Sequence, residues 1–323
     1  MKIALVGPSP DAVGGVSASV QNLRRALDSR KDVQVIYFTW REIWKAPFFR
    51  PDVIHFNFSK PWKRFFGAAL GRLVGASVVH TIHGSGFRIE SSFNRAALSL
   101  SHGVVVLNEK VHARFKGELR YKKAIARFSS VFAEGVLPVN QASINGIRSQ
   151  FEWDGSVRYL LVYAHSDSVK NGSETYGFRF ISQCLSRLNE MGLGVVFLDV
   201  NRSYNQEEIN PRKLENVIYI DRPVDFKAIC CIVDLYVRPT STDGDSVAVI
   251  EALDVGLPVV ASDVVPRPDG VLTYRFLDED DFLLNVKRVI GADGLKAEAR
   301  GLRAPSISSV DEYLLFLRSI VGL

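Results

Sequence analysis

Short apolar stretches alternate with amphipathic ones along the first half of the chain. Runs rich in β-branched and aromatic residues predict strands, and apolar residues at helical spacing predict helices between them. The expected strands are Ile3–Val6, Val33–Phe38, Val53–Phe56, Ser77–Ile82 and Gly103–Leu107, and the expected helices are Ser17–Arg30, Pro61–Val74, Phe93–Ser101 and Lys110–Leu119. This alternation predicts a parallel sheet covered by helices on both faces.

A second series of the same kind begins near Tyr159. Its expected strands are Tyr159–Ala164, Val195–Val200, Val217–Ile220, Leu235–Val237 and Pro258–Ala261, and its expected helices include Gly177–Asn189, Phe226–Cys231, Val247–Val255, Phe282–Ile290 and Asp311–Ile320. The polar segment Val139–Ser156 shows no clear period and is expected to be a linker. We therefore expect an α/β protein of two doubly wound domains facing across a cleft, with ligands at the carboxyl ends of the strands.

Composition fits this picture of a globular protein. The 323 residues favour two domains, and the 47% apolar and 23% charged shares are ordinary. No apolar run approaches the length that a membrane span needs, and the first residues read as a strand, not a signal peptide. Three cysteines, Cys184, Cys230 and Cys231, have no metal or redox spacing, so a reduced, cytoplasmic protein without a metal is expected.

Charge is distributed unevenly between the two halves. Residues 1–150 contain 22 Lys and Arg against 9 Asp and Glu, a net charge of +13. Residues 151–323 contain 18 and 26, a net charge of −8. A basic half is typical of proteins with an anionic partner, although a generally solvated basic surface explains it equally well.

The most informative chemistry lies between Pro239 and Asp263. Asp243 opens a glycine-containing turn, and Glu251 lies eight positions later in the following helix. A turn that leads into a helix offers backbone N–H groups and a positive dipole end to a phosphate. Two nearby carboxylates accept hydrogen bonds from sugar hydroxyls. Together these features indicate a nucleotide-sugar site.

This stretch resembles the donor-site signature of retaining GT-B glycosyltransferases of family 4, also called glycosyl transferases group 1. That signature is Glu-Gly-Phe-Gly, four residues, Glu, and then a Gly-Pro-Val-Val-Ala-Ser segment. Asp243 stands for the first Glu, Gly244 matches, Asp245 and Ser246 replace Phe-Gly, and Glu251 is the second Glu. The tail Gly256–Ser262 also fits.

The resemblance extends to the first half. Gly14 and Gly15 resemble the family's N-terminal Gly-Gly loop, which closes over the donor phosphates and acceptor; the loop is neither a P-loop nor a dinucleotide fingerprint. His83 ends a strand that resembles the family's His-Gly strand, and the resemblance implies contact with the donor sugar or acceptor. We expect His55 and His80 to be structural.

One position departs from the family pattern. Where the family has Gly-Arg, four residues and Lys, this chain has His165 and then Lys170. The family's Arg and Lys bind the donor diphosphate, and a neutral His cannot provide the bidentate fork of Arg. Either a protonated His165 binds phosphate, or another cation such as Arg238 replaces it, or donor turnover is weak.

The resemblance implies a retaining, metal-independent hexosyltransferase of polysaccharide biosynthesis that needs no cofactor. Glu251 would bind the nucleotide ribose, Asp243 would orient the sugar, and Lys170 with the backbone amides of Gly244–Val247 would stabilise the diphosphate. Residues 1–145 would form the acceptor-side domain, 146–308 the donor domain, and 309–323 a helix crossing back to the first domain, begun by a Ser309/Glu312 capping box. A catalytically idle GT-B binding module and a nucleotide-sugar epimerase are the alternatives.

The segment Ser59–Gly67 mixes Lys60, Lys63 and Arg64 with Trp62, Phe65 and Phe66. This mixture suits an anionic membrane surface, which we expect as a partner of a peripheral protein with a glycan or lipid-linked acceptor. Alternatively, Phe65 and Phe66 face the core of a helix whose basic face is solvated. We expect no nucleic-acid partner, because no recognised reading module is present.

Overall fold

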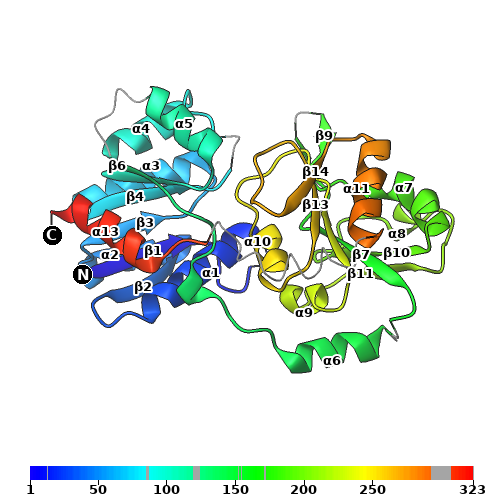
Figure 1. Ribbon diagram of the computed structural model, residues 1–323. Coiled ribbons are helices and arrows are strands. Elements are labelled where there is room, and N and C mark those ends of the chain that lie inside the picture. The colour runs from blue at the N-terminus through cyan, green and yellow to red at the C-terminus, as the bar shows by residue number, and fades with distance from the viewer. Residues whose placement is uncertain are drawn as a thin grey trace. The chain divides into compact units, whose positions relative to one another are not determined.

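A computed structural model describes residues 1–12, 14–84, 87–118, 124–151, 153, 155–170, 172–291 and 307–322. The chain divides into two compact units (Figure 1). Of the described residues, the first unit contains those within 1–137, 244–247 and 307–322, and the second those within 138–243 and 248–291. The division therefore falls before the expected boundary at residue 145, and the last helix belongs to the first unit.

The first unit is built on a parallel sheet with the strand order β2-β1-β3-β4-β5-β6. The strands are β1 (Lys2–Gly7), β2 (Gln34–Thr39), β3 (Val53–Phe56), β4 (Ser77–Ile82), β5 (Gly103–Val106) and β6 (Ala124–Arg127). From β1 the chain goes first to β2 on one side and then to β3 on the other, with Ile3 between Val35 and Val53. The carboxyl ends of β1 and β3 thus flank a topological switch point, where ligands bind in open α/β sheets.

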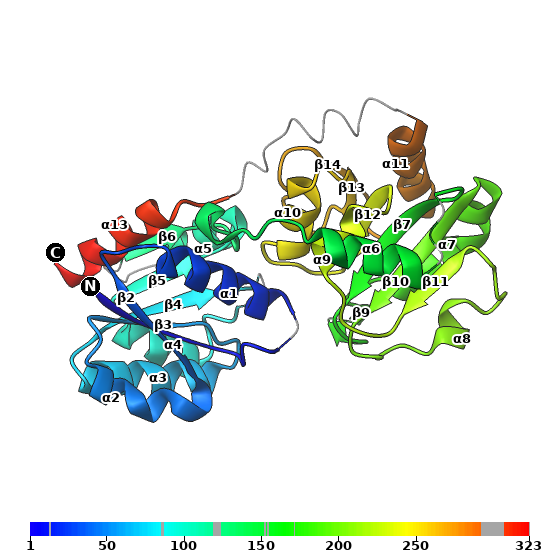
Figure 2. The same ribbon diagram turned by 90° about the horizontal axis from the view of Figure 1, so that it is seen from below.

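Alternating side chains of each strand divide between two cores. Ile3 and Leu5 pack with α1 (Gly15–Asp28) and α13 (Val310–Val321), whereas Ala4 and Val6 pack with η1 (Trp40–Lys45), α2 (Ala46–Phe49) and α3 (Pro61–Leu73). Figure 2 shows α1 and α13 on one face of this sheet and α2 and α3 on the other. A further core under α4 (Ser92–Leu100) and α5 (Glu109–Glu118) completes the unit.

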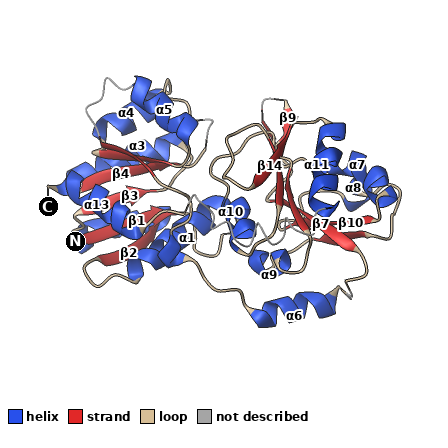
Figure 3. Ribbon diagram, in the orientation of Figure 1, coloured by secondary structure: helices blue, strands red, loops and turns tan. Residues whose placement is uncertain are grey.

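The second unit repeats the plan with one sheet of strand order β11-β10-β7-β12-β13-β14. Figure 3 colours the strands red, with β7, β10 and β14 of this sheet labelled. The strands are β7 (Arg158–Ala164), β10 (Leu193–Asp199), β11 (Val217–Ile220), β12 (Leu235–Arg238), β13 (Val259–Ser262) and β14 (Val271–Tyr274), with a small hairpin of β8 (Val169–Lys170) and β9 (Ser173–Glu174). Its switch point lies between β7 and β12, because the chain fills one side through β10 and β11 before starting β12.

Helices again cover both faces of the second sheet. Leu160, Val162 and Ala164 of β7 point to a core that includes α7 (Phe178–Glu190), α8 (Gln206–Ile209) and α11 (Glu279–Gly291). On the opposite face, Phe226 of α9 (Phe226–Cys230) packs edge-on against Tyr163, with ring centroids 5.7 Å apart. Within the described residues, this unit also contains α6 (Gln141–Gln150) and all but the first residue of α10 (Val247–Asp254).

Two expectations from the sequence are wrong. The expected linker contains helix α6, which Asn140 caps by accepting from the Ala142 N–H and which buries Ile144 and Ile147. The expected capping box of α13 does not form: the Ser309 hydroxyl accepts from the Asp311 N–H, not from the Glu312 N–H that a capping box requires. The Val310 N–H donates to Glu134 (3.1 Å). Residue 119, with which one expected helix ended, lies outside the described residues.

Candidate functional site

The switch point of the second unit gathers several of the predicted residues. His165 directly follows β7, and Arg238 is the last residue of the neighbouring strand β12. Strand pairing sets Val237 opposite Val162, so the two strands end side by side. The sheet therefore places both candidate cations at one edge.

Asp243 lies in this region inside a cluster with two arginines. Arg238 donates to it from Nε (3.0 Å) and Nη2 (3.1 Å), one to each carboxylate oxygen, and Arg267 donates from Nη1 (2.8 Å). Arg267 also donates from Nε to the carbonyl of Ser262, at the end of β13. All three charged side chains are at least nine-tenths buried. The cluster thus fixes the start of the loop that the sequence predicts to hold the donor.

The cluster holds more positive than negative charge. Burial alone would raise the pKa of Asp243, but the charges and hydrogen bonds of Arg238 and Arg267 lower it to about 2. The carboxylate is therefore ionised at neutral pH, and two guanidiniums against one carboxylate give the cluster a net charge of +1. A buried charge excess at the carboxyl edge of a parallel sheet favours an anionic ligand.

Arg267 was not predicted from the sequence. It follows β13 in the segment Pro266-Arg267-Pro268, and two flanking prolines restrict the backbone around it. This restricted backbone is the sequence signal that could have identified Arg267 as a candidate site residue. Asp243 was predicted to orient the donor sugar; both of its oxygens accept from arginines, and its contact with a sugar stays a prediction.

Glu251 lies half-buried on α10. Burial raises the pKa of Tyr163, on β7, and the charge of Glu251 acts in the same direction, which places the carboxylate near the switch point. Tyr163 packs edge-on against Tyr176, whose ring lies 5.5 Å from the Arg238 guanidinium carbon. A carboxylate beside the rings of Tyr163 and Tyr176 is suited to a nucleoside, because the carboxylate accepts hydrogen bonds from ribose hydroxyls and the rings pack against a base.

His165 and Lys170 lie beyond the end of β7. Asn201 donates to the backbone carbonyl of His165 (2.7 Å), and partial burial lowers the pKa of the His165 imidazole. His165 is therefore mainly neutral at pH 7, and Arg238 is a permanent cation at this edge, beside Arg267. Lys170 is exposed on the β8–β9 hairpin, where Glu174 caps the first turn of α7 by accepting from the Phe178 N–H (2.9 Å).

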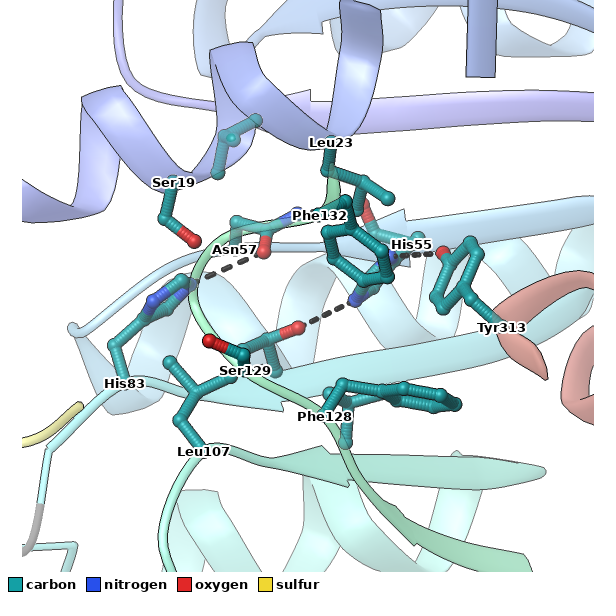
Figure 4. Close-up of a pocket in the computed structure, with 13 residues that line it drawn as sticks. Ser19, Leu23, His55, Asn57, His83, Leu107, Phe128, Ser129, Phe132 and Tyr313 are labelled. Atoms are coloured by element: carbon teal, nitrogen blue, oxygen red, sulfur yellow. Dashed lines mark hydrogen bonds between the residues drawn. The ribbon is translucent and has the colours of Figure 1, made fainter. Parts of the chain in front are cut away.

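The first unit holds a separate set of predicted residues at its own switch point. Gly14 precedes α1 with a φ of 136°, a backbone conformation that glycine adopts without steric cost, and Gly15 begins the helix. His83 follows β4 and donates from Nε2 to Oδ1 of Asn57, which follows β3 (3.1 Å). Figure 4 shows these two side chains pointing toward each other beside Ser19 and Ser129. They line a small cavity of about 10 Å³, room for about one water molecule.

Behind His83, a buried chain of polar groups runs to the last helix. The Tyr313 hydroxyl of α13 is hydrogen-bonded to Nδ1 of His55 (2.6 Å), and Nε2 of His55 to the Thr81 hydroxyl (2.6 Å). Burial lowers the pKa of His55 to about 3, and burial with the nearby Arg64 charge lowers the pKa of His83 to about 3. Both imidazoles are therefore neutral at pH 7 and act as hydrogen-bonding groups. The buried His80 stacks on Phe56.

The predicted donor-binding residues Gly244, Asp245, Ser246 and Val247 group with the first unit. A Cβ on Gly244 would lie 2.2 Å from the His83 carbonyl oxygen, so only glycine fits there. Asp245 accepts from the Ser129 hydroxyl (3.0 Å) and from the Ser130 N–H (2.6 Å). Three predicted residues, His83, Gly244 and Asp245, therefore lie close together, and their roles toward a ligand stay predictions.

Comparison with known proteins shows the fold. No family model and no curated protein matches the sequence. HepE from Anabaena in complex with UDP and sucrose-phosphate synthase from Thermosynechococcus elongatus each align over 100% of both chains, with a TM-score of 0.72 and 14% identity. A putative UDP-N-acetylglucosamine 2-epimerase from Listeria monocytogenes gives a TM-score of 0.63 and 11% identity over 99% of this chain and 96% of its own. The chain therefore has the GT-B fold, with two Rossmann-like domains of six parallel strands each.

Proposed function

We propose that this protein is a retaining glycosyltransferase that moves a sugar from a nucleoside-diphosphate sugar to a glycan or lipid-linked acceptor. The observation that carries the proposal is the Arg238–Asp243–Arg267 cluster at the second switch point, where a GT-B fold offers a buried excess of positive charge to a diphosphate. Among the neighbours, HepE was solved with UDP-glucose, which supports a nucleotide-sugar donor.

In this proposal, the donor is held mainly by residues of the second unit. Glu251 accepts hydrogen bonds from the ribose hydroxyls, and Asp243 positions the sugar-binding loop as well as contacting the sugar. Arg238 supplies the permanent positive charge that the neutral His165 lacks, and it offsets negative charge as the diphosphate leaves. Lys170 and the backbone amides of Gly244–Val247 complete the diphosphate site.

The first unit would supply the acceptor side. The neutral His83, held by Asn57, offers its imidazole to a hydroxyl of the acceptor or the sugar. The acceptor attacks on the face that the diphosphate vacates, so the sugar keeps its configuration. This chemistry uses no metal, and we propose that it takes place in the cytoplasm, with the basic first unit facing an anionic membrane.

Thermal unfolding with UDP, GDP, ADP, TDP and their sugars tests the donor site. Ligand at about 100 times its dissociation constant stabilises the protein by about 2.7 kcal/mol. We expect one nucleotide to raise the melting temperature of the wild type, and Glu251→Ala to remove that shift. Glu215→Ala, at an exposed carboxylate of the same unit, is the matched control. The absence of a shift with every nucleotide would refute the donor site.

Two specific observations favour other functions. Both oxygens of Asp243 are engaged by arginines and His165 is neutral, which favours an idle GT-B module that binds a partner without turnover. The likeness to the putative UDP-N-acetylglucosamine 2-epimerase of Listeria monocytogenes favours a nucleotide-sugar epimerase. Incubation with the stabilising nucleotide sugar separates the three, because an epimerase changes the sugar without acceptor, a transferase needs an acceptor, and an idle module leaves the sugar intact.

A further inference from the structure

Helix α3 packs on the first sheet through its small residues. Gly67, Ala68 and Gly71 are all buried. A Cβ on Gly67 would lie 2.8 Å from the Phe56 ring, and a Cβ on Gly71 would lie 2.6 Å from a methyl group of Val78. At Gly67 and Gly71 the helix therefore lies so close to β3 and β4 that no side chain fits between them, and this contact fixes which side of the helix faces outward.

The outward side of α3 is apolar. Trp62, Phe66 and Leu73 are 40%, 53% and 85% exposed. They are spaced four and seven residues apart, so they form one stripe along the helix. A surface helix normally turns its large apolar residues inward and its polar ones outward. On α3 the arrangement is reversed, and the expectation that Phe66 faces the core is wrong.

The stripe continues onto neighbouring elements. Trp40 of η1 contacts Trp62 edge-on (5.3 Å between centroids), and Phe65 contacts Phe93 of α4 (5.8 Å). Trp44 and Phe48 form a further edge-on pair on η1 and α2 (6.4 Å). We define the aromatic surface as the exposed large apolar side chains of η1, α2, α3 and α4: Trp44, Phe48, Trp62, Phe66, Leu73 and Phe93. It contains every exposed Trp and Phe in the described part of the chain. Such clustering differs from the scattered apolar residues of an ordinary surface.

Positive charge surrounds the aromatic surface. Residues 40–75 contain seven Lys and Arg against two Asp and Glu, a net charge of +5. The Lys63 ammonium lies 5.4–5.6 Å from three ring centroids, those of Phe58, Trp40 and Trp62. One of the two acidic groups, Glu42, is engaged by the Thr39 hydroxyl and Lys45. Aromatic rings flanked by lysines are typical of protein regions that insert into the headgroup layer of anionic bilayers.

We propose that the aromatic surface docks the first unit on an anionic lipid bilayer, with the outward side of α3 buried among the headgroups. None of the helices in the described ranges has the length and apolarity needed to cross a membrane. A second copy of the chain is a poorer occupant, because a two-fold contact through this surface would set two patches of like charge against each other.

This docking rests on the proposed function and adds to it the place where the transferase acts, the surface of an anionic membrane. Trp40 directly follows β2, and Trp62 lies a few residues after β3, so the aromatic surface begins at the carboxyl edge of the first sheet. His83 and Asn57 lie at the same edge. An acceptor anchored in the leaflet would therefore reach the first switch point from the membrane side.

Co-sedimentation of the full chain with lipid vesicles tests the docking. Vesicles of equal parts phosphatidylglycerol and phosphatidylcholine are compared with phosphatidylcholine alone. We expect binding to the anionic vesicles only, weakening with added salt. Phe66→Ser with Leu73→Ser should weaken it at least tenfold, because two large apolar side chains no longer insert. Lys45→Gln with Lys60→Gln should weaken it about fivefold per charge.

Matched controls separate docking from folding. Leu315→Ser removes another exposed leucine, on α13 of the same unit, and Lys213→Gln another exposed lysine; both should bind like the wild type. The proposal is overturned if the wild type does not bind anionic vesicles, or if Leu315→Ser weakens binding as much as the double variant Phe66→Ser with Leu73→Ser. It is also overturned if sedimentation velocity shows a dimer that this double variant dissociates. Vesicle binding needs no nucleotide, so this test and the donor-site test can fail separately.

Discussion

Replacing Asp243 by Asn tests whether the buried charge cluster stabilises the second unit. The amide keeps the size of the side chain but removes its charge. Arg238 and Arg267 then remain buried beside each other without the carboxylate that both contact within 3.1 Å. We expect a large loss of stability, since two like charges are left in a site of low dielectric constant.

Two arguments give the magnitude. Removing one partner of a buried ion pair typically costs about 3–5 kcal/mol. Separately, the pKa of Asp243 is lowered from 3.8, its ordinary value, to about 2 in the folded protein. This shift means that the ionised carboxylate contributes about 2 kcal/mol to the free energy of unfolding. The second figure is smaller because it counts only the charge of the carboxylate, whereas Asn also turns an N–H₂ group toward a guanidinium. We therefore expect the free energy of unfolding to fall by about 2–5 kcal/mol at pH 7.

The pH dependence has a definite sign. The folded-state pKa lies below the unfolded one, so this contribution is present above about pH 4 and is lost as the pH falls toward 2. Urea unfolding followed by circular dichroism at pH 7 and pH 3 measures both effects. Asp254→Asn, which breaks the more exposed ion pair with Lys227, is the control and should cost less than about 1 kcal/mol. Equal losses in the two variants would refute the reasoning.

Three further predictions concern packing and buried histidines. Gly71→Ala should cost about 1–3 kcal/mol in urea unfolding because its Cβ meets a valine methyl, whereas Gly146→Ala on α6, with open space around its Cβ, should be neutral or stabilising. Tyr313→Phe should cost about 1–3 kcal/mol, because Nδ1 of the buried His55 loses its partner. Burial lowers the pKa of His55 and His83 to about 3, so stability should decline as the pH falls from about 6.5 toward 3, and His83→Gln should make that decline shallower.

The sequence predicted the framework of the fold because central strands of parallel sheets are buried on both faces. Val53–Phe56 lies inside the first sheet, is buried at all four positions, and begins and ends where the sequence placed it. The edge strand Val217–Ile220 was also placed correctly, because its four residues are all apolar. The edge strand β6 was missed because its four residues, Ala124–Arg127, carry only one large apolar side chain. Helix α6 was missed because it buries only two residues, Ile144 and Ile147, and two apolar positions do not show a helical repeat.

Contacts between distant residues were beyond the reach of the sequence. Arg267 meets Asp243 because β13 and β12 are neighbours in the sheet, and local pattern does not encode that pairing. The sequence left two orientations of α3 open for another reason. Phe65 and Phe66 are large and apolar, which suits the core as well as a membrane, but the small side chains of Gly67 and Gly71 decide which side packs. Pattern analysis weights large apolar residues, whereas close helix–sheet packing selects small ones.

The membership of α13 in the first unit has a consequence for synthesis on the ribosome. Its residues Val310, Tyr313, Leu314 and Leu317 are fully or almost fully buried in the core that Ile3 and Leu5 begin. All of the second unit, from residue 138, is translated before that core can close. At about 5–20 residues per second, the nascent first unit waits on the order of ten seconds or more with an open apolar face. We expect chaperones to bind it during this interval, whereas the second unit, interrupted only by residues 244–247, can complete its own core as it emerges.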